Sequence, residues 1–202
     1  MSKDLIVKSN KLVDGKYNLS LQQIKFINLL MTKLDKDATT FLKIEIRTSE
    51  LFKAMGIDRR NGSSFIKNLR GLRQKTVILI DGDNTYAECG FLSYFKIDGN
   101  SGLTIIKFEE ELKDLLLNLK KNFTKLSLEK ILNFDSIYTI RFYELVQKEA
   151  AKLEKYKNVK LMNFEIDLQE LKEMLVGDFD KNSQKISIPK SYNLSSTKIK
   201  LK

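Results

Sequence analysis

A basic helical segment, SSFIKNLRGLRQK at 63–75, carries side chains suited to contact with phosphate groups. Its apolar positions, Phe65, Leu69 and Leu72, repeat at helical spacing and can face inward, which leaves the outward side basic and polar. We expect DNA contacts from this helix and the loop before it. The candidate residues are Arg59, Arg60, Ser63, Ser64, Lys67, Arg70, Arg73 and Gln74.

These candidates have different expected roles. Lys67, Arg70 and Gln74 share the outward side, where a helix that precedes a hairpin can supply phosphate and base contacts. The two loop arginines would contact the DNA backbone, and the two serines near the helix start could add amide-assisted phosphate binding. The alternative is an ordinary solvated helix face, which needs no ligand.

The charge balance favours an anionic partner. Thirty-six Lys and Arg against 26 Asp and Glu give a net charge of +10 over 202 residues. Such an excess usually serves nucleic acid or a membrane surface. The membrane is the weaker candidate, because no run approaches the ~18 apolar residues of a spanning helix. Asp4 and Lys8 also interrupt what would be a signal-peptide core, so we expect a cytoplasmic protein without a membrane partner.

Residue types exclude several enzyme classes. The chain has no histidine and one cysteine, Cys89, which removes Ser-His and Cys-His catalysis and the usual zinc sites. No phosphate-binding loop of the type GxxxxGK[ST] and no GxGxxG fingerprint occurs, so neither ATP nor a dinucleotide has an obvious site. The sequence predicts a protein that is not an enzyme and uses no cofactor or metal.

Three clusters resemble enzyme or metal sites but have simpler interpretations. The acidic run that starts at Glu109 could hold a nuclease metal, yet acidic residues at a helix start suit the helix dipole. DGDN at 81–84 could suggest a calcium loop, but it lacks the spacing of one and is typical of a tight turn. Tyr138 and Arg141 could suggest a recombinase-like site, whereas the periodicity buries most of the aromatic residues there. A metal-dependent nuclease remains the less favoured alternative.

The hydrophobic period divides the chain into a series of elements. Helical spacing follows Ser20, which with Gln23 forms a capping box. Thr48 or Ser49 can cap a short helix that Gly56 would end. A further helix, starting at a Ser136 cap, should bury Tyr138, Phe142 and Leu145, with Ile140 beside them, and should pair Arg141 with Glu144. Helices are expected at 21–35, 49–55, 63–75, 109–121, 123–134 and 136–152. Strands are expected at 41–46, 76–80, 85–98 and 103–108.

This order predicts an α+β fold with a winged helix-turn-helix domain. Two short helices followed by an antiparallel β-hairpin are its layout, with the second helix in a DNA groove and the hairpin wing on the backbone. We expect this domain at 1–152, a linker at 153–164, and the incomplete start of a second winged helix at 165–202. A complete second domain would need more residues than follow the linker, so we expect a shortened chain with a weakly ordered basic tail.

Five blocks of sequence, in order, resemble the replication initiator (Rep) proteins of theta-replicating plasmids, a family built from two tandem winged helices. They lie at 7–30, 46–57, 63–80, 123–148 and 166–177. The resemblance implies binding to repeated sites in double-stranded DNA, the iterons, at a plasmid origin. It also implies dimerisation through the first domain, repression by dimers, initiation by monomers, and host replication initiation proteins as further partners.

A shortened chain leaves another function open. It could be a dimerising interaction module or an autorepressor without initiator activity. Strands 76–80 and 103–108 are apolar, and one of them at a sheet edge could offer unpaired backbone groups to a second copy.

Overall fold

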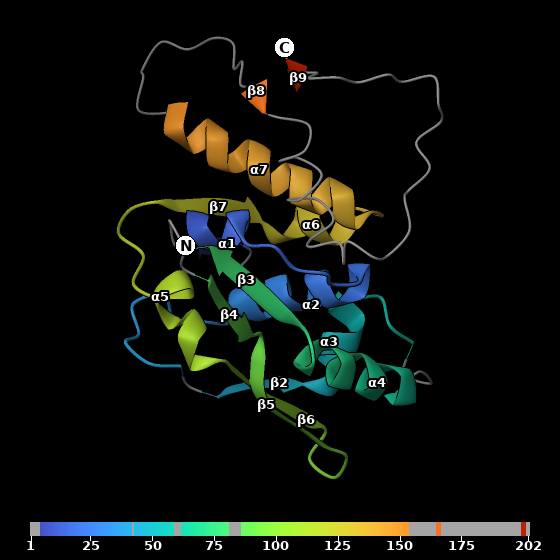
Figure 1. Ribbon diagram of the computed structural model, residues 1–202. Coiled ribbons are helices and arrows are strands. Elements are labelled where there is room, and N and C mark those ends of the chain that lie inside the picture. Colours follow the sequence, from blue (N-terminus) through green and yellow to red (C-terminus); the bar gives the residue numbers. More distant parts are fainter. Residues whose placement is uncertain are drawn as a thin grey trace.

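The computed structural model describes residues 5–41, 43–58, 62–80, 86–153, 165–166 and 199–200. Figure 1 shows that helices surround several small antiparallel sheets, which confirms the expected α+β class. Beyond residue 153 the structure describes two short strands, β8 (Glu165–Ile166) and β9 (Ile199–Lys200), which pair with each other. The other predictions for the linker, the second winged helix and the basic tail lie outside the described residues.

Three helices form the helical part of the winged helix. They are α2 (Leu21–Met31), α3 (Thr48–Ala54) and α4 (Gly62–Arg73). Ser20 and Gln23 form the expected capping box at the start of α2. Gly56, at φ +65°, follows α3 in the left-handed conformation that glycine favours, as expected of a helix stop.

The cap of α3 differs from the expectation. Arg47 occupies the N-cap position and gives no side-chain capping bond, so the prediction that Thr48 or Ser49 caps this helix is wrong. Thr48 already belongs to the helix, and its hydroxyl forms a hydrogen bond of 2.9 Å with the hydroxyl of Thr104 on the neighbouring strand. The threonine therefore ties α3 to the sheet.

A three-stranded sheet completes the winged helix. Its strands are β2 (Ile44–Arg47), β5 (Leu92–Asp98) and β6 (Leu103–Phe108), in the antiparallel order β2-β6-β5. Alternate residues face the core, because side chains along a strand point to opposite faces. Thus Ile44 and Ile46 are buried on β2, whereas Glu45 between them is exposed. The β5–β6 hairpin, placed beside α4, is the wing (Figure 1).

A second hairpin precedes the wing. Strand β3 (Thr76–Ile80) pairs with β4 (Tyr86–Gly90) in a separate two-stranded sheet. The expectation of one strand over 85–98 is wrong, because the chain changes sheets at Phe91 between β4 and β5. The Phe91 side chain is buried and meets the Tyr17 ring edge-on at 5.5 Å, which fixes this change of direction.

The N-terminal segment forms a sheet with a strand from the second half of the domain. Strand β1 (Leu5–Ser9) pairs antiparallel with β7 (Phe123–Ser127), and β1 continues into α1 (Asn10–Asp14). The helix expected over 123–134 is therefore only half correct, since its first five residues are a strand and the helix α6 covers Leu128–Asn133. Thr124 and Leu126 are buried while Lys125 is exposed, which is the alternation of a strand.

The helix expected over 109–121 is also shorter than predicted. It consists of a 3-10 turn, η2 (Glu110–Leu112), and one helical turn, α5 (Lys113–Leu116). Leu115, Leu116 and Leu117 are all buried. Three consecutive residues cannot all face the same side of a helix, so the chain becomes extended at Leu117, with φ −113° and ψ 151°.

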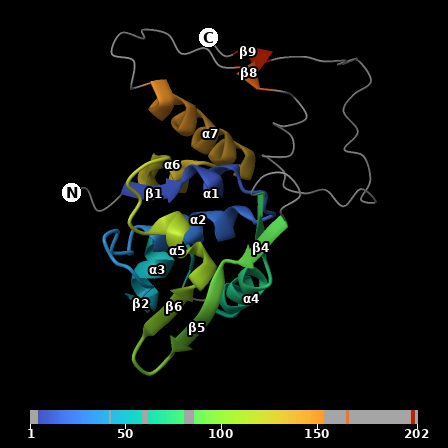
Figure 2. The same ribbon diagram turned by 60° about the vertical axis from the view of Figure 1, so that its left-hand side comes forward.

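The last helix of the domain, α7 (Ile137–Leu153), covers the β1–β7 sheet and α1 (Figures 1 and 2). The prediction that Tyr138 is buried is wrong, because 46% of its surface is exposed. Ile140 and Leu145 are buried as expected, but charged residues fill the positions between and beyond them. The inward face of α7 is therefore partly ionic.

A buried charge cluster joins α7 to the N-terminal segment. Glu144 accepts hydrogen bonds from Lys8 Nζ at 2.5 Å and from Arg141 Nη1 at 2.8 Å, which confirms the expected Arg141–Glu144 pair. Arg141 also donates to the Gly15 carbonyl at 2.8 Å and to the Tyr17 hydroxyl at 2.7 Å. These bonds hold α7 against residues 8–17.

Candidate nucleic-acid interface

Helix α4 has the two-faced character that the sequence predicts. Phe65, Leu69 and Leu72 are buried, as expected for the inward face. The expected DNA-facing residues within and just after the helix are all exposed: Ser63, Ser64, Lys67, Arg70, Arg73 and Gln74. The two loop arginines, Arg59 and Arg60, lie outside the described residues.

The inward face of α4 is fixed by aromatic packing. The Phe65 ring meets Phe52 of α3 at 5.0 Å and Phe26 of α2 at 5.9 Å, in each case edge-on. Such pairs add about 0.5–1.5 kcal/mol beyond the burial of their area. The three helices therefore share one core, and the position of α4 relative to α2 and α3 is well determined.

Polar contacts fix one flank of α4 against α2. The Asn68 side-chain amide donates to Gln22 Oε1 at 2.5 Å, and Gln23 Nε2 donates to the Asn68 carbonyl at 3.4 Å. Gln23 also belongs to the capping box of α2. Its amide thus connects the start of one helix to the middle of the other, which limits rotation of α4 about its own axis.

Charge on the outward face of α4 is uncompensated within the described part of the chain. Lys67, Arg70 and Arg73 form no ion pair with any described carboxylate. Lys67 and Arg70 lie three positions apart and so face the same side, and Gln74 follows one turn after Arg70. Arg73 lies toward the flank. Two cations and an amide are thus presented together, in an arrangement that can meet phosphate oxygens or base edges.

The wing ends in a tight, polar turn. The Asp98 carboxylate accepts from the backbone N–H groups of Asn100 and Ser101 at 3.0 and 3.2 Å. The Ser101 backbone bond, followed by the Lys96 and Asn100 bonds, lowers the pKa of Asp98 below its usual value. Gly102 adopts φ +68°, so the turn needs a residue that tolerates the left-handed region. The sequence analysis names neither Lys96 nor Asn100, although the GNSG turn at 99–102 marks the position of Asn100.

No metal centre is found in the described part of the chain: no three His, Cys, Asp or Glu side chains come together there. Glu110 of the acidic run lies near two lysines, with Lys107 Nζ at 3.6 Å and Lys113 Nζ at 3.9 Å. Burial, together with the nearby Glu111, Glu109 and Glu88 carboxylates, raises the pKa of the Cys89 thiol to about 11. A thiol with so high a pKa is a poor nucleophile at neutral pH.

The helices found in the described ranges include none that is long and apolar enough to cross a bilayer.

The fold places the molecule in the winged-helix class, in which one exposed helix and a hairpin wing lie side by side. The family model described as "Initiator Replication protein, WH1" (Rep3_N) matches residues 5–147. The chain belongs to this family of initiator replication proteins. The match ends within α7, and it includes α4, the wing and the buried charge cluster.

Individual relatives agree with the family assignment. A replication initiation protein of Escherichia coli is 27% identical over 185 residues, which cover 87% of this chain and 55% of that protein. The chain thus spans about half the length of that relative. A crystal structure of the Pi initiator protein in complex with iteron DNA has the same fold, with a TM-score of 0.60 and 19% identity. That likeness covers 91% of this chain and 77% of the Pi chain.

Proposed function

We propose that the protein is a non-enzymatic initiator of plasmid replication that binds repeated duplex sites, the iterons, at an origin. Membership of the initiator family supports this proposal, as does the likeness in fold to an initiator that was crystallised with iteron DNA. The observation that carries it is the outward face of α4. There Lys67 and Arg70 stand exposed without a described carboxylate partner, beside the wing.

In this proposal α4 meets the DNA groove and the wing meets the backbone. The cations of Lys67, Arg70 and Arg73 bind phosphate oxygens, and each such contact releases condensed counterions. Gln74, Ser63 and Ser64 supply uncharged hydrogen bonds at the two ends of the helix. Arg59 and Arg60 are proposed as additional backbone contacts.

Binding measured on two kinds of duplex tests this function. The intact chain is titrated against a duplex that carries the direct repeats of its plasmid origin and against a random duplex, at several salt concentrations. We expect both affinities to fall steeply with salt, because phosphate contacts dominate nonspecific binding. A higher affinity for the repeat duplex supports iteron recognition. Affinity for neither duplex at low salt contradicts the proposal.

We also propose that the protein self-associates, as a dimer that could repress rather than initiate. The two strands first considered for this role are unsuitable. Strand β6 is paired on both sides, and Lys16 bridges to Ile78 on the far side of β3. Strand β4 has β3 as its one described neighbour, and Tyr86 on it is 66% exposed. The β4 edge therefore offers backbone groups to a second copy.

Light scattering across concentration tests self-association. Tyr86→Lys adds a charge at the β4 edge and should weaken the dimer, whereas Tyr138→Lys, at an exposed site on α7, should not. A chain that stays monomeric at high concentration contradicts this second proposal without affecting the first.

A further inference from the structure

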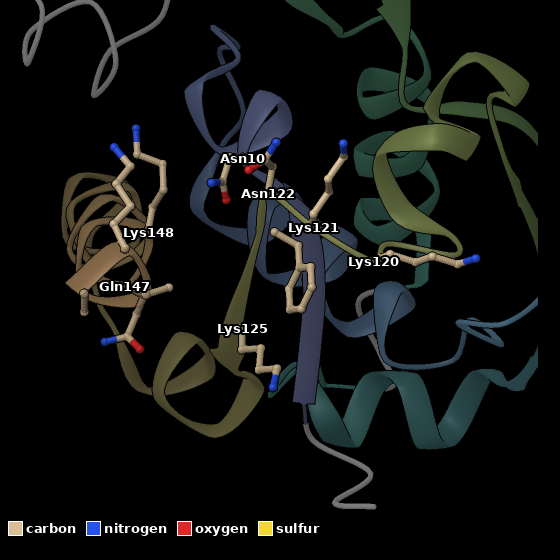
Figure 3. Close-up of a pocket in the computed structure, with 11 residues that line it drawn as sticks. Asn10, Lys120, Lys121, Asn122, Lys125, Gln147 and Lys148 are labelled. Carbon is tan, nitrogen blue, oxygen red and sulfur yellow. The ribbon is translucent and has the colours of Figure 1, made fainter. Parts of the chain in front are cut away.

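A basic groove lies between the C-terminal half of α7 and the chain that leads into β7 (Figure 3). Its volume is about 400 Å³, and five lysines line it, with no carboxylate among the lining residues. The lysines are Lys120, Lys121, Lys125, Lys148 and Lys152. Neither the sequence patterns nor the proposed function makes use of this cluster.

Two of these lysines already have structural partners. Lys148 Nζ lies 2.5 Å from the Asp14 carboxylate and 3.4 Å from that of Glu149, and Lys152 Nζ lies 2.7 Å from Glu149. These pairs account for the charges of Lys148 and Lys152, which α7 contributes to the groove. The other lysines of the groove, on the chain at 120–125, are not paired in this way.

Lys120, Lys121 and Lys125 are exposed and form no ion pair with a described carboxylate. Lys125 contacts the half-buried ring of Phe123 instead, with Nζ 5.8 Å from the ring centroid. Three positive charges within six residues repel one another, so their proximity costs free energy unless an anion lies nearby. The groove therefore has an excess of positive charge that the described structure does not neutralise.

The backbone that presents these lysines is held in a defined shape. Asn118 and Asn122 flank the pair Lys120–Lys121, and both adopt positive φ, at 51° and 54°. Asn118 N–H donates to the Lys36 carbonyl at 2.7 Å, and Asn10 N–H at the start of α1 donates to the Asn122 carbonyl at 2.8 Å. These bonds and turns fix the backbone that carries the lysines before any ligand arrives.

The directions of the side chains suit an extended ligand. Figure 3 shows Lys121 and Lys125 pointing to opposite ends of the groove and Lys120 pointing away from α7. A compact anion would need the cations to converge on one point, whereas a phosphate backbone carries a charge at every nucleotide. Both ribbon views place α7 and α4 at opposite sides of the domain (Figures 1 and 2). A short straight duplex lying against α4 therefore does not reach the groove.

We propose that this groove is a second nucleic-acid contact, which binds the phosphate backbone of a DNA segment other than the one that α4 faces. The inference rests on the proposed DNA-binding function but concerns a different surface. It gives one chain two separate positively charged contacts, so that it can hold a bent duplex or two segments of DNA at once.

Two double variants of the full chain test the proposal. Lys121→Gln with Lys125→Gln removes two charges from the groove, and Lys33→Gln with Lys130→Gln removes two exposed charges that line neither the groove nor α4. Each pair is made in the wild type and in a background that carries Lys67→Gln and Arg70→Gln. Binding of a short random duplex is measured by fluorescence anisotropy against salt, and melting temperatures confirm folding.

In the background that carries Lys67→Gln and Arg70→Gln, we expect the groove pair to lower the magnitude of the log-affinity against log-salt slope by about 1.8, that is, about 0.9 for each lost phosphate contact. In the wild type the groove pair should change the slope less, because a short duplex held by α4 does not reach the groove. The control pair should change the slope far less. Equal effects of the two pairs in the background with the α4 substitutions overturn the proposal, because they reflect net charge alone. Binding to phosphatidylserine vesicles that needs Lys121 and Lys125, while DNA binding does not, also overturns it.

The same experiment separates this inference from the proposed function. If the α4 substitutions leave the slope unchanged and the groove pair removes binding, the groove contact stands and the α4 interface is wrong. If only the α4 substitutions reduce the slope, the α4 interface stands and the groove contact is refuted.

Discussion

Replacing Glu144 with glutamine should destabilise the domain by roughly 3–5 kcal/mol, the usual cost of removing one partner from a buried ion pair. The Glu144 side chain has no exposed surface, and its carboxylate meets both Lys8 Nζ at 2.5 Å and Arg141 Nη1 at 2.8 Å. Glutamine keeps the shape but leaves two buried cations without their anion. For a domain of this size the loss corresponds to a fall in melting temperature of about 6–20 °C.

The pH dependence gives the same prediction a second readout. Burial alone would raise the pKa of Glu144, but the Lys8 and Arg141 charges outweigh burial and bring the pKa below the usual 4.5. On acidification the unfolded chain therefore takes up this proton before the folded chain does. The stabilisation is fully present above about pH 4.5 and is lost as the pH falls through the folded pKa.

Thermal unfolding followed by circular dichroism between pH 3 and 8 is the assay. Glu144→Gln should lower the melting temperature at pH 7. On acidification below the usual pKa of a glutamate, the melting temperature of this variant should fall less steeply than that of the wild type. The matched control is Glu45→Gln, which removes the same charge from an exposed position on β2. If Glu144→Gln and Glu45→Gln have equally small effects at pH 7, the charge cluster does not anchor α7.

Three further substitutions or reactions test particular contacts. Leu69→Ala should lower the free energy of unfolding by roughly 2–5 kcal/mol in a denaturant titration, because Leu69 lies on the buried, inward face of α4. The salt slope of DNA binding by the folded protein should stay unchanged, and an altered slope would contradict the assignment of Leu69 to the inward face. Gly15→Ala should cost about 1–3 kcal/mol, since a Cβ there would lie 2.8 Å from Val77 Cγ2, and a wild-type melting temperature would refute that crowding. Cys89, whose pKa is raised to about 11, should react with iodoacetamide at pH 8 far more slowly than free cysteine, and an equal rate would show that the thiol is not shielded.

Much of the winged helix follows from local patterns. The capping box at Ser20, the buried and exposed faces of α4, and the stop at Gly56 all depend on residues within one or two turns. Their signals are therefore present in short stretches of sequence. The exposed candidates on α4 were predictable for the same reason, because a basic stripe opposite an apolar one indicates which side meets solvent.

The errors occur where distant residues decide the structure. FTKLS at 123–127 pairs with β1, more than one hundred residues earlier, and this pairing makes it a strand. On α7 the buried face includes Arg141, Glu144 and Lys148, whose partners Lys8 and Asp14 are equally distant. Hydrophobic periodicity alone places Tyr138 inside, because no local pattern shows that charged side chains occupy that face.

The basic groove cannot be predicted from the sequence for a related reason. Its walls come from Asn10, the chain at 120–125 and the end of α7, which only the fold brings together. Helical spacing places the run LKKNFTK at 119–125 in two helices, which gives its lysines no common direction. Once β7 is a strand and Asn122 turns the chain before it, Lys121 and Lys125 lie along one wall.

The salt dependence of DNA binding by single α4 variants tests the central claim most directly. Lys67→Ala and Arg70→Ala should each reduce the magnitude of the log-affinity against log-salt slope by about one unit on any duplex, because each removes one phosphate contact. Arg73→Ala should have a smaller effect, since Arg73 lies at the flank of the exposed face. Melting temperatures should stay at the wild-type value, as these side chains are exposed and unpaired within the described residues. If Lys67→Ala and Arg70→Ala keep both the wild-type slope and the wild-type affinity, α4 is not the surface that meets DNA.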